Sequence, residues 1–592
     1  MRGRAPSSRQ CFALLLLCSP ALSASRDAGI LYEVWHTHAA QAMGRVAAVG
    51  AAQLTTELVI QSAGALTLDD VYAPLNQSFD IYNAQPALGF YCLYRARPGQ
   101  PPPVPDCANI SATARAHADR LTAGGFDYVA VDVTNWPMAD VGGSTDVAVL
   151  RPTEVLFEEW AALRAAGVAT PAIAVWPCSP AGSTTWQYLL DTLYNDPRYA
   201  GLVYVQGGKK VVFVPHAGAN CWDPATAALI EANGGRNDVK VIPMWALFGD
   251  GGGAAWQQGV WGFFSPCTDA AGDFTTSMFG GGVGACNQFA TQDNATGPVV
   301  EISASGGYML SQCALPWASP GHLRGLTVAR LFERVLAQSP PHLFMSSFNE
   351  FIGGRQAPAS GAKIAFNMGL PVDPQRAQVW VDTYAAEFSR DIEPTVEAGD
   401  ATWLVAASCV ALYKAAQTCA DAPDAPCCTR ADKDIFVAIW SLRRADGGDA
   451  LLTALVGERD ALVAGKAWAE RCSPIANPTA FCVDGAEPDG RDGPFALYAR
   501  ADVADGRGGA TATAPLFRCM NATANAHFFS ADEGCEGATT ESTLGWMAAA
   551  PGLEMLRALR RCRSAAGARM HALDLACDDP DPAAPGVLGY VR

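Results

Sequence analysis

The 592-residue sequence is poor in charge and has no basic block. Only 17% of its residues are charged and half are apolar, a composition typical of a globular chain. The net charge of −17 makes nucleic acid and anionic membrane surfaces poor partners. The length predicts two or three domains.

Several motifs that identify large enzyme classes are missing. No glycine-rich GxGxxG or GxxxxGK[ST] turn follows a predicted strand, which disfavours dinucleotide-binding and P-loop enzymes. No GxSxG elbow supports a serine hydrolase. No CxxC pair or Cys/His zinc spacing occurs, so we expect neither a structural metal nor a cofactor. Beyond residue 25 no apolar run reaches about 18 residues, which argues against membrane insertion.

Residues 1–25 have the pattern of a secretory signal peptide. Three arginines precede the apolar run Cys11–Cys18, and small residues follow it. The mature protein is therefore predicted to be secreted or extracellular, with the lumen of the secretory pathway as the other destination. Two of the 19 cysteines lie in this segment, and the remaining 17 are scattered, which favours disulfides. Because 17 is odd, one thiol stays free or pairs outside the chain.

Two further features agree with a secretory route. Cys427 and Cys428 are adjacent, cannot readily bridge each other, and are expected to hold two different segments. Four sequons predict a glycoprotein; they begin at Asn76, Asn109, Asn294 and Asn521.

Short apolar strands alternate with helical stretches through residues 26–372. This alternation predicts an α/β fold, a (β/α)8 barrel of the TIM type. Nine strands are predicted, one more than the barrel needs, so either 88–94 or 259–264 is an excursion. The predicted strands are 30–35, 88–94, 126–133, 171–176, 211–216, 239–245, 259–264, 299–303 and 343–345. The predicted helices are 109–122, 153–166, 186–194 and 323–337.

Two further regions follow the predicted barrel. Residues 373–432 read as a helical, cysteine-rich bridge with helices at 375–396 and 402–418. Residues 433–592 contain three repeats, of which the last two are the clearest. The offsets between their matching segments are 43, 44, 42 and 44 residues, as the following pairs show: Leu516–Cys519 with Leu559–Cys562, His527–Ser530 with His571–Asp574, Cys535 with Cys577, and Leu544–Trp546 with Leu588–Tyr590. A β-trefoil-like accessory domain is predicted, with disulfides 519/535 and 562/577.

The stretch Leu343–Gly354 reads as a buried strand that ends in a polar cluster. The carboxyl ends of barrel strands are where this fold keeps its chemistry, and the other predicted strands also end in polar or aromatic residues. Tryptophan faces stack on sugar rings, and amides bond sugar hydroxyls. The candidate substrate-binding residues are Trp35, His36, His38, Asn135, Trp136, Trp176, His216, Trp245 and Asn349.

Cleavage of a glycosidic bond requires two carboxyl groups, one on each side of it. Glu350 and Asp132 are the leading catalytic candidates, with Glu301 and Glu33 in reserve. Glu301 and Glu33 lie within strands, so the alternative for them is a buried structural role. For Glu350 the alternative is an ion pair with an arginine such as Arg355. The histidines at 36, 38 and 216 could instead ligate a metal, although substrate contact is the commoner use.

Several segments resemble the family 99-like and family 71-like glycoside hydrolases. They are Leu88–Tyr91 (LGFY), Gly124–Asp132 (GGFDYVAVD), Asp196–Tyr199 (DPRY), Gly208–Val212 (GKKVV) and Ser347–Phe351 (SFNEF). The resemblance implies a (β/α)8 barrel that acts on α-linked mannans or glucans. The sequence departs from the family pattern after Phe351, where a second acidic residue is missing. An Ile-Glu-Pro triplet at 392–394 lies beyond the last predicted strand, so no catalytic role is carried over to it.

The C-terminal repeats resemble the secreted module known as the domain of unknown function 5648. That resemblance implies a glycan- or surface-binding role, with a structural cap on the barrel as the alternative. The sequence therefore predicts a secreted glycoside hydrolase that uses carboxylate acid/base chemistry on an α-linked oligo- or polysaccharide, with the C-terminal module on a cell-wall or surface glycan. The alternatives are a non-catalytic glycan-binding protein with a degenerate barrel and a structural cell-surface protein.

Overall fold

The computed structural model describes a defined part of the chain. The described residues are 26–36, 82, 84–100, 106–133, 149–177, 185–215, 238–244, 261–262, 267–268, 274–275, 290–292, 297–307, 321–351, 389–428, 436–444, 449–465, 468–470, 495–501, 503, 512–550, 555, 557–563, 569–573, 581–582 and 586–591. The predicted signal peptide lies outside them.

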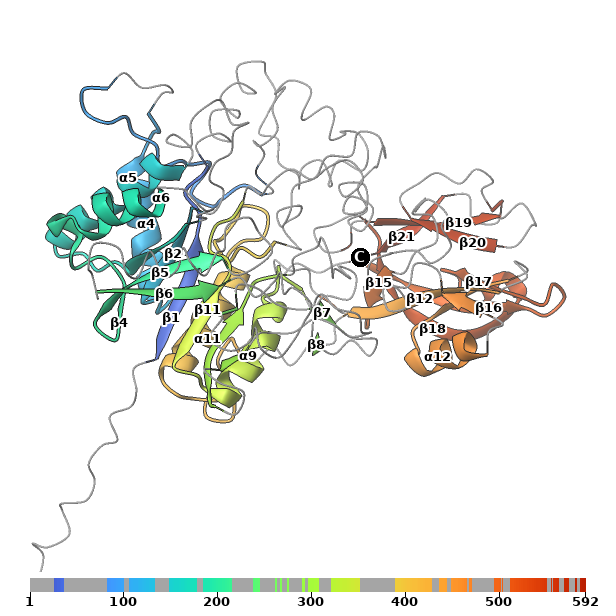
Figure 1. The fold of residues 1–592 in the computed structure, drawn as a ribbon. Coiled ribbons are helices and arrows are strands. Elements are labelled where there is room, and N and C mark those ends of the chain that lie inside the picture. The colour runs from blue at the N-terminus through green and yellow to red at the C-terminus, as the bar shows by residue number, and fades with distance from the viewer. Residues whose placement is uncertain are drawn as a thin grey trace, which may run out of the picture.

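A curled, mainly parallel sheet forms the N-terminal region (Figure 1). Its parallel strands lie in the order β6-β5-β3-β2-β1-β11-β10. Their bounds are β1 Asp27–Tyr32, β2 Tyr128–Val133, β3 Ala172–Pro177, β5 Lys209–Pro215, β6 Val239–Met244, β10 Val299–Ala304 and β11 His342–Met345. Two short antiparallel strands add to it, β4 (Val205–Gln206) on β5 and β9 (Ala290–Gln292) on β10.

Alternate residues of these strands face two different cores. Leu31, Ala130, Phe213 and Phe344 belong to one buried cluster that gathers side chains from six strands, and this places it inside the curl. Their neighbours in sequence, such as Ile30 and Val131, pack instead with the helices. Both faces are thus covered, which explains why the strands are apolar almost throughout.

Residues 261–262 lie between the two edge strands of the curl. Trp261 forms a parallel bridge with Met244 on β6, and the Gly262 N–H donates to the Glu301 carboxylate on β10 at 3.0 Å. The sheet is therefore compatible with a partial TIM-type barrel, as the alternation of strands and helices predicts. Complete closure by eight strands stays a prediction.

Helices cover the outer face of the curled sheet. They are α4 (Ile110–Ala123), α5 (Arg151–Ala165), α9 (Leu326–Gln338) and α11 (Ala401–Lys414), with the short α6 (Thr185–Leu189) followed by a π-turn at Leu190–Tyr194 and a 3-10 turn at Pro197–Tyr199. Helix α11 lies within the predicted bridge, yet it packs on α9. The Tyr413 hydroxyl donates to the Pro340 carbonyl at 2.9 Å, and Val405 and Val410 are fully buried in the same core as the outer face of the sheet.

Of the two candidate excursions, 88–94 is not a strand of the sheet, and the expectation of a helix at 375–396 is wrong over its described end. Residues 88–94 form no strand, because their aromatic side chains turn into the protein and the Tyr94 carbonyl accepts from the Cys107 N–H in a disulfide-closed loop. The predicted helix at 375–396 is not helical over its described end, 389–396. There the Glu393 N–H bonds the Phe348 carbonyl, and Pro394 is a poor residue for a helix interior.

The C-terminal region is an antiparallel sheet with the order β13-β12-β15-β18-β21-β19-β20. Strand β14 also pairs with β12, and β16 pairs with β17 and β18. The bounds are β12 Phe436–Arg444, β13 Ala450–Thr453, β14 Trp468–Glu470, β15 Phe495–Tyr498, β16 Thr513–Asn521, β17 Ala526–Ser530, β18 Thr539–Ala548, β19 Arg557–Arg563, β20 Arg569–Leu573 and β21 Val587–Val591. Helix α12 (Val456–Ala464) and a 3-10 turn (Cys535–Gly537) also belong to this region. In the N-terminal half of the chain, β7 (Cys267–Thr268) and β8 (Phe274–Thr275) form a separate two-stranded pair.

The last two repeats fold alike. In each, a hairpin is followed by a third strand, and the ladder shifts register just after the matching residues Leu516 and Leu559. The third strands then join neighbouring units, through Tyr498 opposite Trp546 and Ala548 opposite Tyr590. Three such units agree with the repeats in the sequence. A trefoil arrangement stays a prediction.

Four disulfides lie in the described residues. Cys427 and Cys428 bond Cys409 and Cys419 respectively, which confirms that the adjacent pair holds different segments. The predicted Cys519–Cys535 bond is present, and Cys92 bonds Cys107. Cys562 is also disulfide-bonded, while Cys577 lies outside the described residues.

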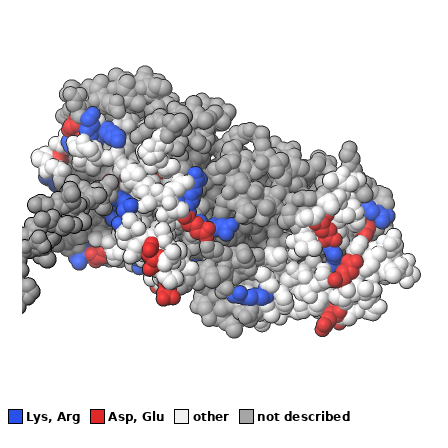
Figure 2. Space-filling view, turned by 90° about the horizontal axis from the view of Figure 1, so that it is seen from below, with Lys and Arg blue, Asp and Glu red and all other residues white. Residues whose placement is uncertain are grey.

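Acidic and basic side chains are interspersed on the described surface that Figure 2 shows. Among the described helices, none is both long and apolar enough to cross a bilayer.

Candidate functional site

Carboxyl groups gather where the central strands of the curled sheet end. Glu33 directly follows β1, and the parallel register that pairs Tyr32 with Val131 brings it beside Asp132 on β2. Glu350 follows the neighbouring strand β11, and Asp391 approaches from a later segment. Asp132, Glu350 and Asp391 all interact electrostatically with Glu33. The structure therefore brings together the two leading catalytic candidates and one of the reserves.

Glu33 lies deepest in this group. Its side chain is fully buried, and within the described structure neither carboxyl oxygen has a hydrogen-bond partner. Burial raises the pKa of Glu33 well above its ordinary value. The nearby Asp132 and Glu350 raise it further, while Arg390 opposes them. These surroundings favour the protonated, uncharged form of Glu33.

Glu350, in contrast, forms an ion pair with an arginine. The Arg390 guanidinium donates to one of its carboxylate oxygens, and both side chains are almost completely buried. The Glu350 N–H donates to Asp391, whose other oxygen accepts from the Ser389 hydroxyl at 2.7 Å. An ion pair of this kind favours the charged carboxylate. The arginine expected beside Glu350 is thus Arg390, whereas Arg355 lies outside the described residues.

The exit of β1 presents further polar atoms without partners. The imidazole of His36 is buried, which lowers its pKa to about 3 and keeps it neutral at ordinary pH. Its Nε2 lies 2.8 Å from the main-chain carbonyl oxygen of Asn349. Because a carbonyl oxygen can only accept, Nε2 carries the hydrogen and Nδ1 is a bare acceptor. Within the described structure, Nδ1 of His36 and the indole N–H of Trp35 have no partner.

Asn349 is fully engaged by the protein itself. Its Oδ1 accepts from the Glu33 N–H at 2.8 Å. Its Nδ2 donates to the Glu33 carbonyl at 3.1 Å and to the Tyr91 hydroxyl at 3.0 Å. Both amide hydrogens are used, so this side chain is built to hold Glu33 in place.

Glu301 lies at the other end of the sheet. Its register partner is His342, the first residue of β11, and His342 also pairs with Asp27 at the start of β1. Burial raises the pKa of Glu301 to about 8, although the Gly262 N–H and the Thr291 hydroxyl each donate to its Oε2 at 3.0 Å. The structure does not bring Glu301 together with Asp132 and Glu350.

The remaining candidates divide in two. Trp176 lies fully buried on β3, in the inner core and opposite Asp132 in the ladder. The others lie outside the described residues: His38, Asn135, Trp136, His216 and Trp245. No cluster of three or more potential metal ligands occurs among the described side chains.

The segment Ser389–Glu393 supplies an arginine and two carboxyl groups to the site. Its Ile-Glu-Pro triplet was noticed in the sequence but was given no role, because it lies beyond the last strand and carries no strand pattern. Tyr91 and His117 were also missed, because they lie within a predicted strand and a predicted helix and not at a strand end.

No known protein-family model matches the chain, and neither does any curated protein. Two solved structures of the GH99 endo-alpha-mannosidase from Bacteroides thetaiotaomicron, one in complex with BIS-TRIS-propane, are weakly similar to it. In each case the identity is 15% and the TM-score 0.35, and the match covers 66% of this chain and 98% of the other. Similarity of this degree leaves the function to be argued from the residues of this chain.

Proposed function

We propose that the protein is a secreted glycoside hydrolase that cleaves α-linked glycans by carboxylate acid/base chemistry. One observation carries the proposal: the fully buried Glu33 carboxyl, which has no hydrogen-bond partner in the described structure and a pKa raised by burial, lies among other carboxyl groups at the carboxyl end of the curled sheet. Two groups whose surroundings drive their charge states apart are what such a reaction needs.

Glu33 is the proposed general acid. Its raised pKa favours retention of the proton, and no described hydrogen-bond partner contacts its carboxyl oxygens. In the reaction it would pass to the oxygen of the leaving sugar as the glycosidic bond breaks. Glu33 thus moves from a reserve to the leading acid, and Glu301, at the other end of the sheet, has no role in this proposal.

Glu350 and Asp132 are the proposed carboxylates on the other side of the bond. These two residues keep 7% and 5% of their accessible surface, whereas Glu33 keeps none, so they lie nearer to solvent. One of them would assist attack on the anomeric carbon, either directly or through a water molecule. Arg390 suits Glu350 to this role because it holds the group ionised.

Sugar hydroxyls can bond the polar atoms at the exit of β1. The neutral Nδ1 of His36 accepts and the Trp35 indole N–H donates, so together they match a hydroxyl, which can do both. Asn349 is better explained as a positioning residue than as a substrate ligand. The α linkage and a glycan-binding role for the C-terminal module rest on the sequence resemblances. The predicted domain division rests on the strand and helix pattern and on the repeats.

The decisive experiment is a screen of α-linked mannan and glucan oligosaccharides for release of reducing ends. Wild type is compared with Glu33→Gln, Glu350→Gln and the matched control Glu301→Gln, which alters a buried carboxyl at the far end of the sheet. We expect the first two variants to lose about 100-fold to 10,000-fold in rate and the control to keep its rate. Release that survives Glu33→Gln would remove Glu33 from the mechanism.

A non-catalytic glycan-binding protein is the second candidate function. The observation that favours it is the neutralisation of Glu350 by Arg390, which a purely structural ion pair would also show. Calorimetric titration with the same oligosaccharides separates the two. Binding by wild type without release, unchanged in Glu350→Gln, would support this second function.

A further inference from the structure

We propose that Tyr91, Glu393 and His117 are positioning residues that fix Glu33 through Asn349. The inference rests on the proposed function for its catalytic meaning, whereas its structural part stands independently. None of the three residues touches the acid itself, so each acts through a neighbour.

Asn349 acts as a two-point clamp on the main chain of Glu33. It accepts from the N–H and donates to the carbonyl of that residue, at 2.8 and 3.1 Å. Since the Glu33 carboxyl has no hydrogen-bond partner in the described structure, no direct bond fixes its place. Its position therefore follows the backbone, and the backbone follows Asn349.

A buried chain of hydrogen bonds fixes Asn349 in turn. Its second amide hydrogen goes to the Tyr91 hydroxyl at 3.0 Å, and that hydroxyl donates to Glu393 Oε2 at 2.6 Å. The other oxygen of Glu393 lies 3.2 Å from His117 Nε2, and His117 Nδ1 lies 2.7 Å from the Tyr32 hydroxyl. Every donor in the chain has one acceptor, so the chain is satisfied from end to end.

The chain joins three segments that are each anchored elsewhere. His117 lies on α4 and packs edge-on against Tyr91 and Phe348, with ring centroids 4.8 and 5.2 Å away. The Glu393 N–H donates to the Phe348 carbonyl at 2.9 Å. This bond joins the segment Ser389–Glu393 to the residues that follow β11. Tyr91 directly precedes the disulfide Cys92–Cys107.

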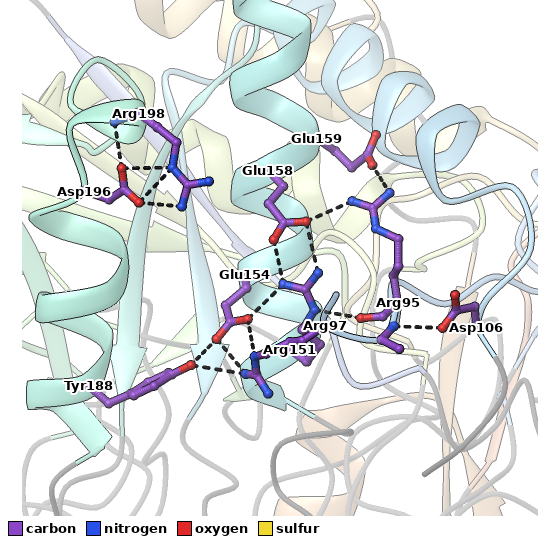
Figure 3. Close-up of polar contacts among 11 residues, drawn as sticks. Arg95, Arg97, Asp106, Arg151, Glu154, Glu158, Glu159, Tyr188, Asp196 and Arg198 are labelled. Carbon is purple, nitrogen blue, oxygen red and sulfur yellow. Dashed lines mark hydrogen bonds and ion pairs between the residues drawn. The ribbon is translucent and has the colours of Figure 1, made fainter. Parts of the chain in front are cut away.

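An ionic cluster attaches the segment that follows Tyr91, through Arg95 and Arg97, to helix α5 (Figure 3). Arg95 bonds Glu158 and Glu159 at 2.9 and 2.8 Å, and Arg97 bonds Glu154 at 2.7 Å. Arg151 completes the cluster by donating to the Arg95 carbonyl at 2.7 Å and pairing with Glu158 at 2.6 Å. Tyr91 is therefore attached to a segment with little freedom to move, as a positioning residue requires.

The test uses the titration of Glu33, read from stability, so that it does not depend on activity. The charged groups around Glu33 are Asp132 on β2, Glu350 after β11, and Arg390 and Asp391 on the last segment. In wild type, replacing Glu33 by Gln is expected to stabilise the protein increasingly as the pH rises from 4 to 8, because the native acid resists ionisation. We expect this gain to fall by at least half in a Tyr91→Phe background, because a displaced Glu33 carboxyl would have more polar surroundings and would ionise more easily.

Tyr194→Phe is the matched control. Tyr194 is equally buried, and its hydroxyl bonds only the main chain, at Val175 and Val211. Its loss is expected to lower stability without altering the pH-dependent gain of Glu33→Gln. Glu393→Gln, which keeps the carbonyl acceptor, is the second test variant should Tyr91→Phe fold poorly. An undiminished gain in either folded background would overturn the positioning role.

Activity supplies the complementary measurement. On an α-linked oligosaccharide that wild type cleaves, Tyr91→Phe is expected to lower kcat about tenfold to 100-fold with KM little changed, since the acid is displaced while the sugar contacts remain. A rise in KM alone would contradict the inference. If wild type releases no sugar, the proposed function fails, whereas the stability cycle still decides whether these residues position Glu33.

Discussion

Two buried arginines, Arg561 and Arg390, differ in the balance of positive and negative charge around them. Arg561, in the C-terminal sheet, donates to Glu536 at 2.6 and 3.0 Å and to the Phe529 carbonyl at 2.8 Å, and its Nε lies 2.7 Å from Asp581 in an ion pair without hydrogen-bond alignment. Arg563 adds a second cation beside Asp581 at 3.7 Å. Among the described groups, two cations thus meet two carboxylates, a balance that stabilises buried charge.

Arg390 has a different set of charged neighbours. Among the described groups that act on Glu33 it is the one cation, and the carboxyls there are Asp132, Glu350 and Asp391 in addition to Glu33 itself. An excess of buried carboxyls costs stability, because one of them must keep a proton or remain without a counter-ion. The comparison teaches that the C-terminal cluster serves the fold, whereas the cluster beside β1 is the kind of arrangement that functional sites maintain at the expense of stability.

The largest expected effect is from Arg561→Met. The substitution leaves Asp581, which is fully buried, without its nearest counter-charge, and breaking a buried pair from one side costs about 3–5 kcal/mol. Urea unfolding of the full chain should show the loss in the transition of the C-terminal sheet.

Arg563→Met is the matched control for that substitution. The Arg563 side chain is 40% exposed and lies farther from Asp581, so the expected cost stays below about 1 kcal/mol. Equal losses in the two variants would mean that the balance of charge around Arg561 is not what stabilises this cluster.

Close packing between the repeats predicts the next effect. A Cβ at Gly589 would lie 2.6 Å from the Met547 Cβ of the preceding unit, and the matching Gly545 is as close to Leu497. Gly589→Ala should therefore cost about 1–3 kcal/mol by overpacking. Gly457→Ala, in helix α12 with open space around it, should instead gain about 0.5–1 kcal/mol. Equal shifts in thermal midpoint for the two variants would argue against a close contact between units.

Periodic features of the chain could be predicted from the sequence, and features made by distant segments could not. Strands such as 126–133 and 171–176 have apolar runs of the right length, and the repeats matched their paired strands, so both were found. The stretch at 88–94 has the same apolar character but packs through its aromatic rings. A pattern of residue types does not separate these two outcomes.

The candidate site shows the same division. Asp132 and Glu350 could be predicted because each ends a strand, and the fold then brings neighbouring strand ends together. Arg390 and Glu393 lie 40 or more residues after β11, in a segment without periodicity, and only the folded chain shows that they return to it. The choice of Glu33 as the leading candidate acid could also not be made from the sequence, because its pKa is raised by burial and by three carboxyl neighbours.

Glu33→Gln should stabilise the protein at pH 7 while lowering glycan release at least about 100-fold. Below about pH 4.3, the ordinary glutamate pKa, both the native and the unfolded state hold the proton, so no pH-dependent gain is expected. Above it the unfolded state ionises while the raised pKa of native Glu33 opposes ionisation, so wild type loses stability as the pH rises. Thermal midpoints from pH 4 to 8 test this, and a gain that shrinks with rising pH would contradict the protonated acid.

Glu301→Gln should also stabilise the protein, with a gain that stops rising near pH 8, and should leave glycan release unchanged. The pKa of about 8 means that wild type loses stability from about pH 4.3 upward and that the loss levels off near pH 8, where native Glu301 also ionises. A glutamine amide in the place of Oε1, which has no partner in the described structure, offsets part of this gain. If Glu301→Gln abolished release while Glu33→Gln spared it, the chemistry would belong to the opposite end of the sheet. The contrast between the two clusters would then need to be drawn around Glu301 instead of Arg390.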